Sequence, residues 1–183
     1  NSNTPVTGQR VTKNAGSISV ARDASTPAAS LLDDTGSVKT VSYKFEAVND
    51  TYVIVEATAT ISNASVVSSV KLKDGSNVLA TKPGAGTVVF GGIMVPVNAN
   101  TTKILDVEVD LASVGYGAGD TGASIVTQLT GAKARANASG IISALGAGEG
   151  IPATAGNGLY VYKAVPTITL SSLPTSTLAT GSG

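Results

Sequence analysis

Carboxylates are the side chains in this sequence most capable of chemistry, and they concentrate in two places. Asp106, Glu108 and Asp110 alternate with apolar residues, and Asp33–Asp34 forms a second acidic pair. A spacing of two places the first three side chains on one face of an extended strand. That row could bind Ca²⁺ if a second loop supplied more oxygens, such as those of Asp120. We favour a solvated strand edge whose charges discourage sheet stacking, and we therefore assign no metal site.

Two further groups of side chains could act together. Glu46 and Glu56 fall on segments expected to be adjacent strands, with Lys44 nearby, which favours an exposed cross-strand ion pair worth under ~1 kcal/mol. Tyr160 and Tyr162 share one face of another expected strand. Packing in the core or between sheets explains these two rings more simply than a sugar-stacking platform does.

The residue types that the chain lacks exclude most other chemistry. There is no His, no Cys and no Trp. Without His or Cys, the sequence can form no zinc finger, thiolate nucleophile, Ser-His-Asp triad or disulfide. The glycine-rich stretches do not precede a Lys-Ser/Thr pair, so they are not phosphate-binding loops. We expect no enzymatic activity, no catalytic residues and no cofactor.

Charge and hydropathy restrict the classes of partner. The 183 residues include 12 Lys+Arg and 12 Asp+Glu, and only 13% are charged and 4% aromatic. A neutral, aromatic-poor chain lacks both the basic field and the stacking side chains that bind nucleic acid. No apolar run reaches about 18 residues, so we expect no membrane-spanning helix. The first residues do not resemble a signal peptide, so a secreted protein would be present in its mature form.

Four Asn-x-Ser/Thr sequons occur, at Asn49, Asn63, Asn100 and Asn137. In a chain so rich in Ser and Thr, most such matches arise by chance. They become candidate glycosylation sites only if the protein reaches a glycosylating surface.

β-Strands must position all of these side chains, because the apolar residues recur with a period of two almost everywhere. The expected strands cover residues 17–21, 41–47, 52–61, 66–72, 77–80, 87–90, 93–97, 103–111, 124–129 and 158–165. Strands this short, with turn residues at regular spacing, indicate an antiparallel two-sheet β-sandwich. The sequence therefore predicts an all-β fold.

Turn residues suggest how these strands connect. Only residues 49–51 separate two strong strands, which we expect to form a hairpin, and Asp74-Gly75 predicts a tight hairpin turn. Gly91-Gly92 interrupts an alternating segment where a bulge or a switch between sheets would fit. For the Ala- and Gly-rich residues 131–155 we favour an extended or irregular excursion over a helix.

The two ends of the chain echo each other. Ser-Ile-Ser-Val at 17–20, followed by Pro-Ala-Ala-Ser-Leu, corresponds to Thr-Ile-Thr-Leu at 167–170, followed by Pro-Thr-Ser-Thr-Leu. Low complexity could produce this echo by accident. Taken as real, it divides the chain into an N-terminal extension (1–15), a sandwich domain (16–165) and a segment that looks like the start of another module (166–183).

The segment after residue 165 is then an apolar-alternating strand without its own sheet. It could return to cap its own sandwich, or complete a sheet of a neighbouring subunit by strand addition. The second arrangement would link copies head to tail into an open fibre. The N-terminal residues 5–13, with Val6 and Val11, are a second candidate donor strand, so the donating terminus stays open. The candidate subunit-linking residues are Thr167, Ile168, Thr169, Leu170, Leu173 and Leu178.

Four stretches together resemble a known type of domain. They read SVKTVSYKFEAVNDTYVIVEATATI, VVSSVKLKDGSNVLA, VPVNANTTKILDVEVDL and GNGLYVYKAVPTITLSSLPTSTL. In strand rhythm and in the KDG hairpin, they resemble immunoglobulin-like sandwich modules of prokaryotic exported surface and filament proteins. The resemblance implies an exported structural or adhesive module with no catalytic residues. In such proteins a Lys, an Asn and an acid can form an isopeptide bond, but for Lys44, Glu46 and Glu56 we favour the ion pair.

These observations predict a structural subunit of an extracellular filament or surface assembly, joined to copies of itself by strand donation. The alternative is a cell-surface adhesive or carbohydrate-binding module, whose partners would be glycans or other surface proteins. Both place the protein outside the cell or at its surface.

Overall fold

The structure is a computed structural model that describes residues 14–115, 119–146 and 154–165. In this part of the chain the polypeptide is almost entirely β-strand, and its one helical element is a 3₁₀ turn, η1 (Ala64–Val66). The strands are β1 (Ser17–Arg22), β2 (Ser30–Asp33), β3 (Ser37–Val48), β4 (Tyr52–Ile61), β5 (Val67–Asp74), β6 (Asn77–Pro83), β7 (Thr87–Val97), β8 (Thr101–Leu111), β9 (Ala123–Ile125), β10 (Thr127–Ala136), β11 (Ile142–Gly146) and β12 (Leu159–Tyr162).

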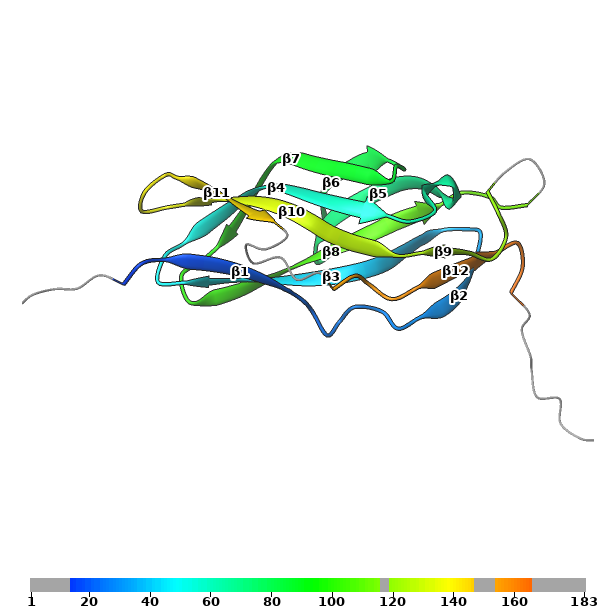
Figure 1. Cartoon of the computed structure of the whole chain (residues 1–183), viewed down its shortest axis with the longest axis horizontal. Helices are drawn as coiled ribbons and strands as arrows, with labels where there is room; N and C mark the ends of the chain where they lie inside the picture. The colour runs from blue at the N-terminus through cyan, green and yellow to red at the C-terminus, as the bar shows by residue number, and fades with distance from the viewer. Residues whose placement is uncertain (1–13, 116–118, 147–153, 166–183) are drawn as a thin grey trace, which may run out of the picture.

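Two antiparallel sheets face each other and form the sandwich (Figure 1). One has five strands in the order β1-β3-β8-β5-β6, and the other has four in the order β11-β10-β4-β7. A smaller three-stranded sheet, β2-β12-β9, lies at one end, and its β2 and β12 run parallel. The predicted antiparallel β-sandwich is therefore confirmed.

The period-two pattern explains why these segments are strands with one buried face. On β8, Leu105, Val107 and Val109 are buried, while the acidic residues between them are only partly covered. The same alternation runs along β7 and along residues 43–48 of β3, whereas residues 40–43 of β3 are buried on both faces. The core beneath is built mainly from Val, Ile, Leu and Ala, and its only large aromatic side chains with under 2% exposure, within the described residues, are Tyr43, Phe45 and Phe90.

Tyr43 ties the two layers together through its hydroxyl group. The ring is buried on β3, and its hydroxyl donates to the Thr154 carbonyl (2.9 Å) and accepts from the Leu129 amide of β10 (3.0 Å). Burial raises the pKa of this phenol. β11 pairs only with Gly131–Arg135 of β10, so it does not reach the Leu129 amide. The Tyr43 hydroxyl gives this buried amide the hydrogen-bond partner that it would otherwise lack.

Residues 49–51 do not form the predicted hairpin. β3 pairs with β1 and β8, whereas β4 pairs with β10 and β7, so the chain crosses from one sheet to the other at this turn. A connection of three residues can span facing sheets about 10 Å apart as well as adjacent strands of one sheet. Both arrangements need the same turn residues, so the local sequence does not distinguish them.

Two of the predicted turns are confirmed. The Asp74-Gly75 hairpin joins β5 to β6, and Gly75 has a φ of 59°. The pairing of β7 with β4 shifts register between Gly91 and Val95, and Gly92 has a φ of 74°, as a bulge in one continuous strand requires.

The expected strand over residues 124–129 is divided between two sheets. β9 pairs with β12, and after Val126 the chain continues as β10 beside β4. β10 extends to Ala136 and turns back as β11, so the predicted extended character of this region is right, but it forms a regular hairpin. β2 was not expected at all, because four residues give too short an alternation to recognise.

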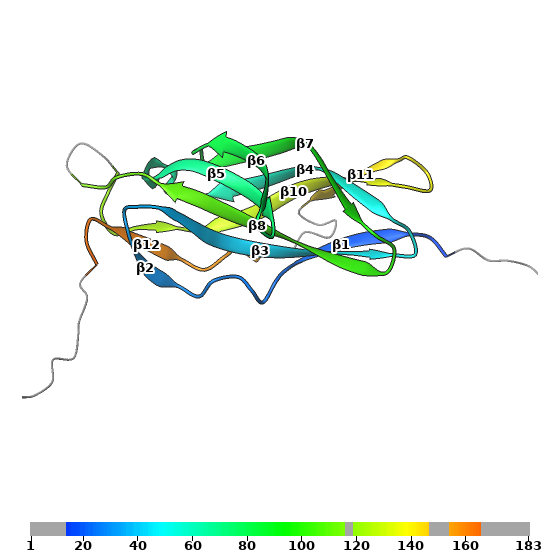
Figure 2. The same cartoon turned by 180° about the vertical axis from the view of Figure 1, so that it is seen from behind.

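The described chain begins and ends at opposite ends of the elongated sandwich. Asn14 lies at the β1 end and Val165 at the end formed by β2, β12 and β9, as both views show (Figures 1 and 2). Every strand named above falls within residues 17–162. Among the described residues, no helix is long and apolar enough to cross a membrane.

Candidate functional site

The acidic row of β8 lies at the centre of the five-stranded sheet, not at its edge. β8 is paired with β3 on one side and with β5 on the other. The expected strand edge is therefore wrong, although the expected face is right, because Asp106, Glu108 and Asp110 point outward. The sequence pattern defines the face of a strand, but the position of a strand in its sheet depends on contacts distant in sequence.

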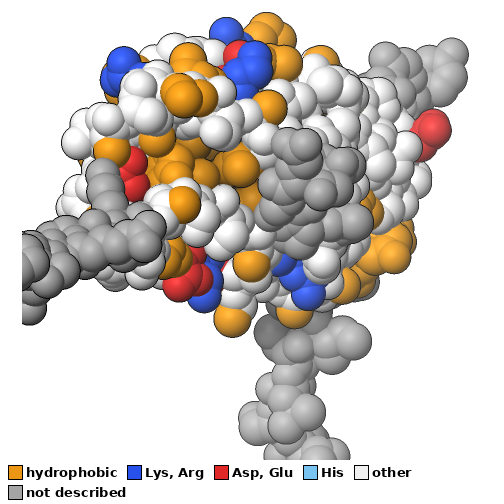
Figure 3. Space-filling model, turned by 60° about the vertical axis from the view of Figure 1, so that its left-hand side comes forward, with side chains coloured by type: hydrophobic (Ala, Val, Ile, Leu, Met, Phe, Trp, Pro, Cys, Tyr) orange, Lys and Arg blue, Asp and Glu red, His pale blue; other side chains and the backbone are white. Residues whose placement is uncertain are grey.

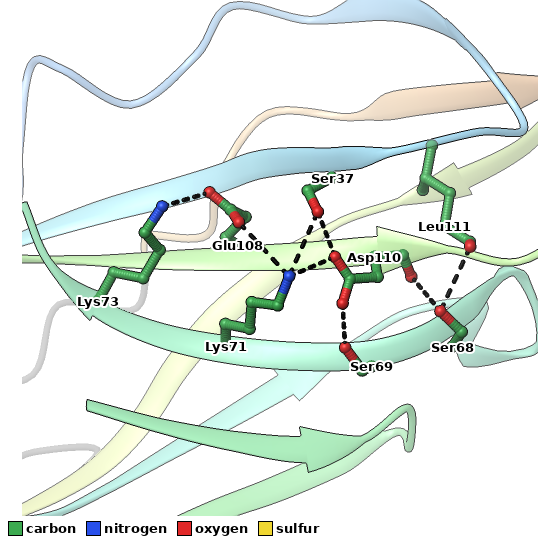
Figure 4. Close-up of polar contacts among 8 residues, drawn as sticks. All are labelled: Ser37, Ser68, Ser69, Lys71, Lys73, Glu108, Asp110 and Leu111. Atoms are coloured by element: carbon green, nitrogen blue, oxygen red, sulfur yellow. Dashed lines mark hydrogen bonds and ion pairs between the residues drawn. The ribbon is translucent and has the colours of Figure 1, made fainter. Parts of the chain in front are cut away.

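Lysines from both flanking strands pair with this row, and Figure 4 shows the two that come from β5. Lys71 Nζ lies 2.6 Å from Asp110 Oδ1 and 3.8 Å from Glu108 Oε1, and Lys73 Nζ lies 2.9 Å from Glu108 Oε2. From β3, Lys39 Nζ approaches Asp106 Oδ1 at 3.7 Å. We call these residues of β3, β8 and β5 the charged lattice. Each carboxylate of the row has a lysine partner on a neighbouring strand.

Asp110 is the most strongly perturbed acid of the charged lattice. Hydrogen bonds from Lys71, Ser37 and Ser69 lower the pKa of its carboxyl from 3.8 to about 2. Isopeptide formation needs a neutral amine next to a carboxyl group that can be protonated. The ionised Asp110 carboxylate and the Lys71 ammonium group form an ion pair, and this arrangement stabilises the fold but does not favour an isopeptide bond.

The structure does not assemble the calcium site considered from the sequence. Within the described residues, which include Asp120 and the acidic row, no group of three or more Asp or Glu side chains is arranged to hold a metal ion. The oxygens of the row are occupied by lysine ammonium groups, which supply the positive charge that a cation would otherwise bring.

The predicted ion pair among Lys44, Glu46 and Glu56 is wrong. Glu46 lies on β3 and Glu56 on β4, in different sheets. Glu56 instead pairs with Lys133 of β10, with Nζ and Oε1 2.9 Å apart. The error follows directly from the mistaken hairpin at residues 49–51.

Tyr160 and Tyr162 also differ from the expectation. Leu159 and Val161 are buried, so the two tyrosines occupy the outward face of β12, and Tyr160 is 40% exposed. They are not core side chains. Successive residues of a strand face opposite sides of its sheet, so with Leu159 and Val161 on the inner face the two tyrosines must face outward.

The four sequon asparagines are all exposed at turns. Asn49, Asn63 and Asn100 are the only non-glycine residues of the described chain with positive φ, at 61°, 49° and 58°. Asn tolerates this left-handed conformation better than most residues. The turn geometry therefore accounts for Asn at three of these positions, and glycosylation stays a prediction.

A groove at the β2 end was missed by the sequence reasoning. It has a volume of about 580 Å³ and is lined by Leu31, Leu32 and Asp33 of β2 and by Lys163, Ala164 and Val165. Leu31 is 56% exposed, and within the described residues β2 pairs with β12 alone, so its other edge is open. In the sequence, the only feature that pointed to this surface was Leu31, the last residue of the Pro-Ala-Ala-Ser-Leu segment that is echoed near the C-terminus.

Asp34 contacts Lys163, one of the residues that line this groove. Its Oδ2 accepts a hydrogen bond from the Val114 amide (3.0 Å) and lies 3.3 Å from Lys163 Nζ. The hydrogen bond from Val114, together with Lys163, lowers the pKa of the Asp34 carboxyl. Because Asp34 follows β2 and Lys163 follows β12, this contact holds the ends of the two strands together.

The opposite end of the sandwich is also recessed. A pocket of about 280 Å³ lies there between the start of β1 and the β10–β11 turn, with Asp50, Tyr52 and Ala136 among its lining residues. Figure 3 shows this side of the molecule, where hydrophobic side chains gather in a hollow of the surface.

Comparison with known proteins identifies no family. No protein-family model matches the chain, and no curated protein matches it significantly. One similar solved structure is a family 123 glycoside hydrolase from Clostridium perfringens, with a TM-score of 0.39 and 5% identity. The match covers 82% of this chain but only 28% of that one. Similarity at this level gives no indication of activity.

The candidate subunit-linking residues of the C-terminal segment, from Thr167 to Leu178, lie outside the described residues, as do residues 1–13. Strand donation by either terminus therefore stays a prediction. The described residues include the open edge of β2, to which such a strand could add.

Proposed function

We propose that this protein is a structural subunit of an extracellular filament or surface assembly, in which copies join head to tail through a terminal strand. One observation carries the proposal. The described chain enters at one end of an elongated sandwich and leaves at the other, beside a strand whose outer edge is open. A contact between opposite ends of identical subunits is heterologous, and repeating it produces an open filament.

The surface chemistry supports the same proposal. The net charge is zero, so copies can approach without long-range repulsion. The three lysines and three carboxylates of the charged lattice balance in charge within one subunit. The strand order β1-β3-β8-β5 facing β10-β4 also follows the order ABED facing FC of immunoglobulin-like sandwiches, which supports the proposed relation to surface modules.

The second candidate function is an adhesive or carbohydrate-binding module at the cell surface. The outward tyrosines of β12 favour it, because aromatic rings exposed on a sheet can stack on sugars. Binding of the folded monomer to a glycan array, abolished by Tyr160→Ala, would support this function over the structural one.

Electron microscopy of the full chain at increasing concentration tests the proposed function. We expect linear threads one subunit wide. Variants lacking residues 1–13 or residues 166–183 identify the donating terminus, and circular dichroism confirms that each variant keeps its sheets. If the full chain remains monomeric at every concentration, the filament proposal is wrong.

A further inference from the structure

We propose that the open edge of β2 and its adjoining groove bind the N-terminal segment of a second copy of this chain, with Val11 beside Leu31 and Lys13 beside Asp33. This inference rests on the proposed function and names the donor and the acceptor within it.

The acceptor offers both backbone and apolar contacts. The outer N–H and C=O groups of β2 have no strand partner among the described residues, so another strand can extend the sheet there. Leu31 and Asp33 occupy the outward face of β2, and the groove of about 580 Å³ lies next to them. Exposed apolar surface at an unpaired edge is the usual condition for strand addition.

The direction of the chain fits a parallel addition. β2 runs toward the end of the sandwich that holds Val165, and the parallel β12 runs the same way. In a head-to-tail filament, the next subunit places its Asn14 end against this end. Its residues before Asn14 would then extend back along β2 and run parallel to it.

The spacing of residues in the donor matches that of the acceptor. In an extended segment, residues two apart share a face, so Val11 and Lys13 point the same way. Leu31 and Asp33 have the same spacing on β2. A parallel register that places Val11 beside Leu31 therefore also places the ammonium group of Lys13 beside the carboxylate of Asp33.

Charge favours this donor over the C-terminal one. Residues 1–13 contain Arg10 and Lys13 and no acidic residue, whereas residues 166–183 contain no charged side chain. Asp33 is exposed and has no ion-pair partner among the described residues, unlike Asp34, which pairs with Lys163. A basic segment can neutralise Asp33, and an uncharged segment cannot.

A chain cannot place its own Val11 on its own β2. Ser17 pairs with Val48 at one end of β3, and β2 precedes the other end of β3 by a short turn. β3 has 12 residues and is roughly 40 Å long. Val11 is only six residues before Ser17, a reach of about 22 Å at most. The donor must therefore come from another copy.

Cysteine cross-linking tests the contact cleanly, because the chain has no native cysteine. The full-length Val11→Cys/Leu31→Cys variant, mildly oxidised under conditions in which the wild type associates, should give a ladder of disulfide-linked oligomers on a non-reducing gel. Each single variant should stop at dimers. The matched control, Leu170→Cys/Leu31→Cys, should give no ladder. A ladder from the control and none from the first variant would overturn the inference.

A charge exchange provides the second readout. Lys13→Asp should weaken association about fivefold, and adding Asp33→Lys should restore it. Glu46→Lys, an exposed charge reversal on β3, is the control and should not restore it. Failure of both readouts while the wild type still forms threads refutes this contact and leaves the filament proposal standing. A wild type that never associates refutes the filament proposal itself.

Discussion

The charged lattice and the β2 edge both lie on the surface of the same sandwich, but they differ in how many of their charged and backbone groups have partners within the subunit. In the charged lattice, β8 has a partner strand on each side, and every carboxylate of its row faces a lysine. At the β2 edge, one side of the strand is open, Leu31 is 56% exposed and Asp33 has no ionic partner among the described residues.

This difference shows where a function based on assembly can reside. The titratable side chains of the charged lattice form their ion pairs within one subunit, so they contribute to its folding stability. The β2 edge has fewer charged groups, but its outer backbone groups and the Leu31 side chain can gain partners only from another chain. Substitutions in the charged lattice should therefore change folding stability, and substitutions at the β2 edge should change association.

The largest effect should come from the same substitution made in the core beneath the charged lattice and at the β2 edge. Leu105 is 2% exposed on the inner face of β8, so Leu105→Ala should lower the free energy of unfolding by about 2–5 kcal/mol. Leu31→Ala should change it by less than about 0.5 kcal/mol and weaken association instead. Urea denaturation and light scattering measure the two effects. Equal losses of unfolding free energy in the two variants would contradict the proposed difference between the core beneath β8 and the β2 edge.

A medium effect is expected when Asp110 loses its charge. Asp110→Asn should lower the free energy of unfolding by about 1–2 kcal/mol near neutral pH, since partial exposure screens its ion pair. The pKa of Asp110 is about 2 in the folded state against an ordinary 3.8, so its contribution is present above pH 3.8 and lost as the pH falls toward 2. Unfolding curves of the wild type and the variant should converge at low pH. A difference that persists at pH 2 would argue against this origin.

The smallest effect should be the pairwise one between Lys73 and Glu108. Their ion pair is partly exposed, so a double-mutant cycle with Lys73→Gln and Glu108→Gln should give a coupling below about 1 kcal/mol. High salt should reduce it further. A coupling of several kcal/mol would contradict the description of the charged lattice as a set of weak, solvent-screened ion pairs.

Local patterns in the sequence predicted the longer strands and most of their buried faces, but not their partners. Leu105, Val107 and Val109 alternate with acidic residues, and that alone defines the buried face of β8. The Asp74-Gly75 turn was predictable because tight hairpins need a positive φ that glycine supplies. The crossing at residues 49–51 was not, because a short connection serves a hairpin and a sheet-to-sheet crossing equally well.

The candidate site was predictable only in part, for the same reason. The outward direction of the acidic row followed from its spacing, but its position between β3 and β5 depends on pairing with residues distant in the sequence. The exposure of Tyr160 follows from the existence of the small end sheet, which no local pattern indicates. The open edge of β2 is a property of the assembled sheet, so four residues of sequence could not reveal it.

Electron microscopy of the wild type beside full-length Leu31→Asp shows whether copies join through the β2 edge. The substitution places a second carboxylate at the open edge and leaves the core untouched, so folding should be unchanged. We predict threads from the wild type and folded monomers from the variant. Threads of equal length from both proteins would contradict a head-to-tail contact through the β2 edge.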